Sequence, residues 1–240
     1  MNATLTSERL VEGMAQAHLH QEKRPPVQKP TAQPFTIAIS RDSGANGHVI
    51  ARALGFRLDW PVYDQELLRK VADDMGLRAR MLESLDEKRA NWLAESLACF
   101  TTSTPTADSG AYVHHLVETL FSLAAQGECV ILGRGAAQVL PSNTTLRVRL
   151  VGPRKERIET VQKRLGLEWA EATRLIAQTD HDRTQFVVHN FSKDPADPCN
   201  YDLVLNSARL GVATCADLIV ETLLRVQAPT MANGPAHGAS

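Results

Sequence analysis

The stretch "FTIAISRDSGANGHVIARALG" (residues 35–55) decides the fold. Its run "FTIAI" has the composition of a strand, the next residues form a turn with Gly44 and Gly47, and helical spacing follows. Proteins bind phosphate with a strand, a glycine-containing turn and a helix in this order. Glycine lets the backbone approach an anion, and the helix N-terminus attracts negative charge. The stretch therefore predicts an α/β domain with a candidate phosphate site after its first strand.

Strand-like and helix-like segments alternate along the rest of the chain. The predicted strands, rich in Val, Ile, Leu and Tyr, are residues 35–40, 60–64, 128–133, 146–151 and 201–206. Helical patterns occupy residues 47–58, 65–76, roughly 80–99, 112–126, 153–165, 168–190 and 212–226. Several strands are apolar on both faces and are followed by a helical segment, as a buried parallel sheet requires. The pattern predicts a doubly wound α/β fold with a five-stranded parallel sheet.

The two ends of the chain differ from this pattern. Residues 1–34 include "QEKRPPVQKPTAQP", whose four prolines indicate an extended linker, so this segment is predicted to be flexible. Residues 227–240 are small and polar and are interrupted by Gly and Pro, which predicts a disordered tail. The compact domain is therefore expected over residues 35–226.

Composition limits the function classes. The formal net charge of -1 gives no overall basic field, so specific nucleic-acid binding is not expected. The four cysteines are widely spaced and form no C-x-x-C pair, so neither a metal site nor a disulfide framework is predicted. No stretch approaches the ~18 apolar residues of a membrane span, and the N-terminus has no signal-peptide pattern. A cytoplasmic protein without membrane attachment is expected.

The loop after the first strand departs from the phosphate-binding P-loop, G-x-x-x-x-G-K-[ST]. In that motif the Lys binds the β/γ-phosphates and the Ser or Thr hydroxyl binds Mg²⁺. Here Arg41 stands at the first glycine position and Gly47 at the lysine position, and no Ser or Thr follows. On these residues alone, an ordinary glycine-containing turn between a strand and a helix remains the alternative.

An ordered set of motifs carries a family resemblance. It comprises "ISR-x-x-G-x-x-G", a helix ending in "LG", "WPVYDQELL", "VILGRGAAQVLP", the basic segments "RKERIETVQKRLGL" and "EATRLIAQTDHDR", and "NYDLVLNSARLGV". Residues 35 to about 225 thereby resemble the cytidylate kinase-like family of P-loop nucleoside monophosphate kinases. The resemblance implies a P-loop kinase-like three-layer fold with a helical lid. It also implies ATP and Mg²⁺ as cofactors and CMP or a related monophosphate as acceptor.

The resemblance also assigns roles to individual residues. The phosphate-binding loop would comprise Arg41, Ser43, Gly44, Ala45, Asn46, Gly47 and His48. The acceptor would be bound by Arg134, which follows "CVILG" at the carboxyl edge of the predicted sheet, and by Asp64. A guanidinium can bind phosphate through two parallel hydrogen bonds. The alternatives are a surface arginine in a turn and, for Asp64, a helix cap.

The lid of such a kinase needs cations, because the transferring phosphoryl group is negatively charged. The candidates on the basic helices are Arg157, Arg164 and Arg183. The alternative is a solvated helix face with i,i+4 ion pairs.

Two functions of different classes remain. The first is a nucleoside monophosphate kinase, favoured by Arg134 and the basic lid. The second is a nucleotide sensor or partner-binding module without turnover, favoured by the missing Lys and Ser/Thr. The expected partner is a nucleotide, and the sequence does not predict the oligomeric state.

Overall fold

Five strands form one parallel sheet in a computed structural model that describes residues 35–68, 83, 85, 87–101 and 110–227. The strands are β1 (Thr36–Arg41), β2 (Val62–Tyr63), β3 (Cys129–Leu132), β4 (Thr145–Val151) and β5 (Leu203–Asn206). Their order is β2-β3-β1-β4-β5, and every neighbouring pair is parallel. The predicted five-stranded parallel sheet is confirmed.

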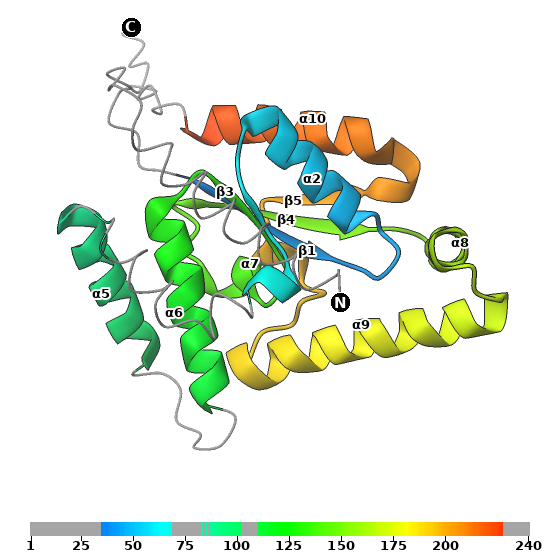
Figure 1. The fold of residues 1–240 in the computed structure, drawn as a ribbon, viewed down its shortest axis with the longest axis horizontal. Coiled ribbons are helices and arrows are strands. Elements are labelled where there is room, and N and C mark those ends of the chain that lie inside the picture. Colours follow the sequence, from blue (N-terminus) through cyan, green and yellow to red (C-terminus); the bar gives the residue numbers. More distant parts are fainter. Residues whose placement is uncertain (1–34, 69–82, 84, 86, 102–109, 228–240) are drawn as a thin grey trace, which may run out of the picture.

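Helices cover both faces of the sheet (Figure 1). On one face lie α2 (Gly47–Leu58) and α10 (Ser207–Gln227), which contact each other. On the other lie α5 (Glu87–Thr101), α6 (Gly110–Gln126) and α7 (Ala136–Val139). The predicted three-layer architecture is confirmed.

The central strand β1 is buried from both sides. Ile37 and Ile39 belong to the apolar cluster under α2 and α10, and Ala38 belongs to the cluster with α6. Successive side chains of a strand point to opposite faces, so an apolar run such as "FTIAI" suits a strand that is covered twice. This burial holds the carboxyl end of β1, from which the loop continues, between β3 and β4.

The two basic helices form a separate pair. These helices, α8 (Arg154–Leu165) and α9 (Trp169–Phe191), share a small core of Ile158, Val161, Ala172 and Ile176. Figure 1 shows α8 at the edge of the molecule and α9 running back toward α6 and α7. This pair corresponds to the predicted helical lid.

Some boundaries differ from the sequence-based expectation. Strand β2 is shorter than residues 60–64, because the Asp64 side chain already accepts hydrogen bonds from the next turn. Helix α10 begins before residue 212, although Gly211 (φ 77°, ψ 168°) interrupts its helical backbone. Helix α7 has only four residues and was not predicted.

Three predictions concern residues only partly described. The helix predicted at 65–76 is helical at 65–68, and its remainder lies outside the described residues. The segment 1–34 and all of the predicted tail except Gln227 also lie outside them. Among the described residues, no helix has the length and apolar character to cross a membrane.

Candidate functional site

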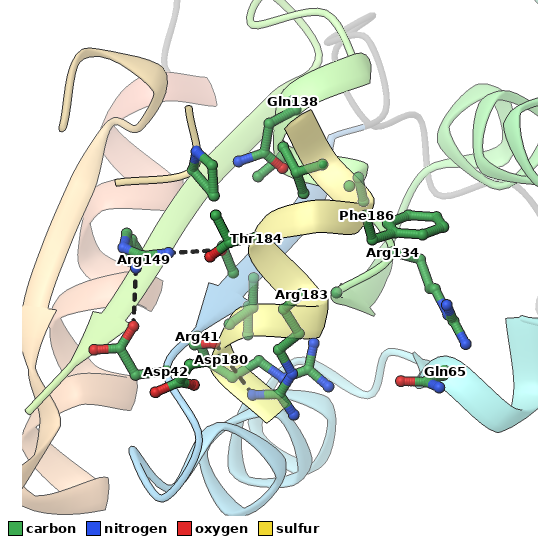
Figure 2. Close-up of a pocket in the computed structure, with 18 of the residues that line it drawn as sticks. Arg41, Asp42, Gln65, Arg134, Gln138, Arg149, Asp180, Arg183, Thr184 and Phe186 are labelled. Atoms are coloured by element: carbon green, nitrogen blue, oxygen red, sulfur yellow. Dashed lines mark hydrogen bonds and ion pairs between the residues drawn. The ribbon is translucent and has the colours of Figure 1, made fainter. Parts of the chain in front are cut away.

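A cavity of about 260 Å³ lies at the carboxyl ends of β1 and β3 (Figure 2). Its wall is formed by the end of β1, the turn after β3, and α9. The side chains that give it chemical character are Arg41, Asp42, Gln65, Arg134, Gln138, Arg149, Asp180, Arg183, Thr184 and Phe186. In open α/β sheets, this edge is where ligands bind.

Three arginines from distant parts of the chain meet in this cavity. Arg41 ends β1, Arg134 lies in the turn after β3, and Arg183 lies on α9. Arg183 Nη1 donates to the backbone oxygen of Arg41 at 3.3 Å, and Figure 2 shows these two side chains lying together. Within the described part of the chain, none of the three guanidinium groups forms an ion pair with a carboxylate. The site therefore carries positive charge that no carboxylate of the described residues pairs with.

The surroundings of Arg41 and Arg183 disfavour the charged form of both guanidinium groups. Burial lowers the pKa of Arg41, the positive charges of Arg183 and Arg134 lower it further, and Asp64 partly offsets them. Burial also lowers the pKa of Arg183, against the raising effect of Asp180 and Asp42. A bound anion would relieve both penalties, because an opposite charge at short range favours the charged form.

Arg134 is positioned by its turn and by an aromatic ring. Gly133, Arg134 and Gly135 all have positive φ, at 86°, 55° and 74°. A Cβ on Gly135 would lie 2.7 Å from Cδ2 of Phe191, so only glycine fits there. The Arg134 Cζ lies 5.3 Å from the centroid of Phe186, a cation–π distance. Its Nε is buried and has no hydrogen-bond acceptor among the described residues.

Two other arginines near this edge form ion pairs with carboxylates of the protein. Arg149 Nη2 pairs with Asp42 at 2.8 Å, and its Nη1 donates to Ser40 Oγ at 3.1 Å. Arg157 Nη1 pairs with Asp180 at 2.6 Å and also donates to the Ser43 oxygen at 3.0 Å. These pairs join the loop after β1 to β4, α8 and α9.

Of the predicted phosphate loop, Arg41 lines the cavity, whereas residues 43–48 lie beside it. Its Ser43 N–H donates to Asp180 Oδ1 at 2.7 Å. Gly44 lies against α8, where a Cβ would be 2.9 Å from Cα of Arg157. Within the described residues, the backbone N–H groups of Gly44, Asn46, Gly47 and His48 have no acceptor, so four donors remain for an anion.

The other sequence-predicted residues also lie outside the cavity lining. Asp64 Oδ1 accepts from the N–H groups of Glu66 and Leu67 at 3.1 and 3.0 Å, so it caps the helical turn at 65–68. His48 Nε2 lies 3.9 Å from Asp64 Oδ2. Burial lowers the pKa of His48, which favours the neutral ring at pH 7. Arg164 is exposed on α8.

Seven of the ten cavity side chains named above were not among the predicted site residues: Asp42, Gln65, Gln138, Arg149, Asp180, Thr184 and Phe186. Arg149 had a usable signal, because a charged residue within a buried parallel strand calls for a partner. Phe186 follows Arg183 by three residues, which places both on one face of α9. Gln138 is buried and donates to the Tyr201 hydroxyl at 2.7 Å, a contact that no local pattern indicates.

The carboxylates here do not fit a metal site held by the protein. In the described part of the chain, no group of three or more His, Cys, Asp or Glu is arranged to hold an ion. Asp42 and Asp180 are paired with Arg149 and Arg157, and burial raises the pKa of Asp42. The available groups are hydrogen-bond donors and cations, which suit phosphate oxygens.

Two curated proteins match part of the chain in sequence. A cytidylate kinase from Methanopyrus kandleri is 33% identical over 95 residues, which cover 36% of this chain and 49% of that protein. A uronate isomerase from Corynebacterium glutamicum is 35% identical over 97 residues, covering 40% of this chain and 19% of that protein. The chain thus spans about half and about a fifth of the lengths of these two curated relatives.

A solved structure and a family model cover more of the chain. The uncharacterized protein from Eubacterium ventriosum superposes with a TM-score of 0.62 at 24% identity, covering 80% of this chain and 98% of that one, which shows a common fold. The model of the cytidylate kinase-like family matches residues 36–209, a span from β1 into α10 that includes all three unpaired arginines. The chain therefore belongs to the cytidylate kinase-like family.

Proposed function

We propose that this protein is a nucleoside monophosphate kinase that transfers the γ-phosphoryl group of ATP to CMP or a related monophosphate. One observation carries the proposal: Arg41, Arg134 and Arg183 meet at the carboxyl edge of the sheet without carboxylate partners among the described residues. Family membership supplies the class of ligand, a nucleotide.

The acceptor phosphate would bind to Arg134 and Arg183. The two side chains come from different elements, the turn after β3 and α9, and reach one cavity. Binding between them would bring the acceptor phosphate close to Arg41 and the loop. Such transfers depend on positioning and charge neutralisation far more than on covalent chemistry by the protein. The three cations match that requirement.

The phosphates of ATP would bind at the loop. The N–H groups of Gly44, Asn46, Gly47 and His48, which have no acceptor within the described ranges, stand at the N-terminus of α2, where a helix attracts anions. Mg²⁺ would be carried by the nucleotide, since the nearby carboxylates are paired with arginines. Arg157 and Arg164 on α8 remain proposed lid cations. Arg157 would have to exchange its contact with Asp180 for the nucleotide.

A second candidate is a nucleotide-binding module without turnover. It is favoured by the engaged half of the loop, where Ser43 N–H is bound to Asp180 and Gly44 lies against Arg157. A chain that keeps this arrangement would bind a monophosphate at the arginines and would not position ATP for transfer.

The experiment is a coupled assay of ADP formation with ATP, Mg²⁺ and a panel of monophosphates (CMP, dCMP, UMP, AMP and GMP), with nucleotide binding measured in parallel. The kinase proposal predicts ADP formation that depends on the monophosphate and yields the matching diphosphate. Binding of a monophosphate without ADP formation would overturn it in favour of the binding module.

A further inference from the structure

The side chain of Arg41 crosses the position where a P-loop has its lysine. Arg41 ends β1, and Gly47 begins α2. A Cβ placed on Gly47 would lie 2.8 Å from Cγ and 3.2 Å from Cβ of Arg41. Real Cβ atoms do not approach other atoms so closely. The stem of Arg41 therefore fills the space into which a side chain at position 47 would extend.

The guanidinium of Arg41 lies against a second glycine. A Cβ on Gly133 would overlap Nη1 of Arg41 and lie 3.0 Å from its Cζ. Gly133 follows β3 and precedes Arg134, so the Arg41 guanidinium lies between the loop and the turn proposed to bind the acceptor. Gly47 thus leaves room for the stem of Arg41, and Gly133 leaves room for its guanidinium.

Nothing in the described part of the chain neutralises Arg41 directly. The carboxylates around it have other partners, since Asp42 pairs with Arg149, Asp180 pairs with Arg157, and Asp64 caps the turn at 65–68. Of the charged groups that shift the pKa of Arg41, Arg183 and Arg134 are themselves cations, and only Asp64 opposes them. The position of Arg41 is therefore explained by a ligand better than by a contact within the protein.

We infer that Arg41 supplies, from the end of β1, the cation that lysine supplies in a P-loop, and that Gly47 and Gly133 are glycines because they leave it space. Its ligand is the terminal phosphate of the phosphoryl donor. The inference rests on the proposed function for the identity of the nucleotide, and it explains how the loop can lack lysine and retain a cation.

The main test variant is Arg41→Met, which keeps an unbranched stem over Gly47 and removes the charge. It is compared with Arg41→Lys, Gly47→Ala and the double variant Arg41→Met/Gly47→Ala. The control is Arg225→Ala, because Arg225 is 78% exposed and pairs with Glu221 on α10. Binding of ATP and of inorganic pyrophosphate is measured by calorimetry, and phosphoryl transfer by the coupled assay. Thermal melting shows whether each variant is folded.

Arg41→Met should weaken ATP and pyrophosphate binding at least tenfold, and Arg41→Lys should recover part of that loss. Gly47→Ala should also weaken binding, by roughly three- to tenfold, although alanine is the better helix former at this position. In the Arg41→Met background Gly47→Ala should have no further effect, because it acts by displacing Arg41. Arg225→Ala should bind as the wild type does.

The outcomes separate the inference from the proposed function. Transfer and ATP binding within twofold of wild type in Arg41→Met would overturn the inference and leave the kinase standing. So would a Gly47→Ala effect that persists undiminished in the double variant. Arginine-dependent binding of ATP without transfer would overturn the kinase and support the inference. A wild-type protein that binds neither ATP nor pyrophosphate would overturn the inference directly.

Discussion

The cavity edge contains two sets of arginines with opposite arrangements. Arg149 and Arg157 have short ion pairs with Asp42 and Asp180, at 2.8 and 2.6 Å. Arg41, Arg134 and Arg183 face the same edge without such pairs among the described residues. The first set joins loop, strand and lid to one another, and the second keeps its charge for a ligand.

This difference shows which cations serve the fold. A partly buried ion pair stabilises only while both partners remain, since removing one leaves an uncompensated charge. An unpaired, partly buried cation lowers stability and persists where function requires it. Both sets consist of arginines, so residue type cannot distinguish a structural cation from a ligand-binding one. The presence or absence of a carboxylate partner can.

The largest expected effect is that of Arg134→Ala. Loss of the two charged hydrogen bonds to the acceptor phosphate, at about 1.5–3 kcal/mol each, should lower kcat/KM by roughly 10²- to 10⁴-fold at 1.4 kcal/mol per decade. Arg134→Lys should recover only part, because an ammonium cannot make the planar two-bond contact. The kcat/KM values of both variants are measured by steady-state kinetics, with Arg225→Ala as control. Undiminished phosphoryl transfer by Arg134→Ala would show that Arg134 does not bind the acceptor.

Breaking a member of the paired set should act on stability. Asp180→Ala leaves Arg157, whose side chain is 12% exposed, with only the longer 4.0 Å contact of its Nε to Asp42, and it frees the Ser43 N–H. The free energy of unfolding should fall by about 1–3 kcal/mol, measured by urea denaturation. The matched control is Asp182→Ala, two residues along α9, where Asp182 is exposed and accepts from Gln178. Equal effects of the two variants would contradict a structural role for the Arg157–Asp180 pair.

Gly47→Lys tests where the loop cation resides. From the sequence alone this change should preserve or raise turnover, because it restores the P-loop lysine. The structure reverses that expectation, since any Cβ at position 47 meets the stem of Arg41. We expect kcat/KM to fall about tenfold, the loss of one cation–phosphate contact. Turnover above that of the wild type would show that Arg41 does not occupy the lysine's role.

The smallest expected effect concerns the stability of Arg41→Met. The pKa of Arg41 is lowered in the folded chain by burial first and then by Arg183, so its charge opposes folding at neutral pH. That penalty is relieved only as pH rises through the lowered folded pKa, above neutrality. Arg41→Met should therefore melt about 2–4 °C higher, equivalent to about 1 kcal/mol, with the same difference from pH 6 to pH 8. A lower melting temperature would indicate that Arg41 serves the fold.

Much of the fold could be predicted because its signals are local. The "FTIAI" run, the glycines after it and the helical spacing from residue 47 lie within one stretch, and β1, the turn and α2 follow it closely. Arg134 could be proposed because it follows a predicted strand directly, which places it at the carboxyl edge.

The pairing of the arginines could not be predicted in the same way. Asp180 binds the Ser43 N–H across 137 residues of sequence and also pairs with Arg157 from another helix. Local charge patterns cannot distinguish such an aspartate from Asp182, two residues away. The path of the Arg41 side chain depends on the space left by Gly47 and Gly133. Gly133 is distant in sequence and comes near Arg41 only because β1 and β3 are neighbours in the sheet.

The central claim, that the unpaired arginines bind a nucleotide phosphate, is tested most directly by comparing a nucleoside with its monophosphate. The monophosphate to use is the acceptor with the highest kcat/KM or, if there is no turnover, the monophosphate that binds most tightly. This monophosphate and its nucleoside are each titrated calorimetrically into wild type and Arg134→Ala. The account predicts that the monophosphate binds wild type about 100-fold more tightly than the nucleoside, equivalent to about 2.7 kcal/mol, and that Arg134→Ala removes at least a tenfold part of this preference. Equal affinity of wild type for nucleoside and monophosphate, or a preference unchanged in Arg134→Ala, would contradict it.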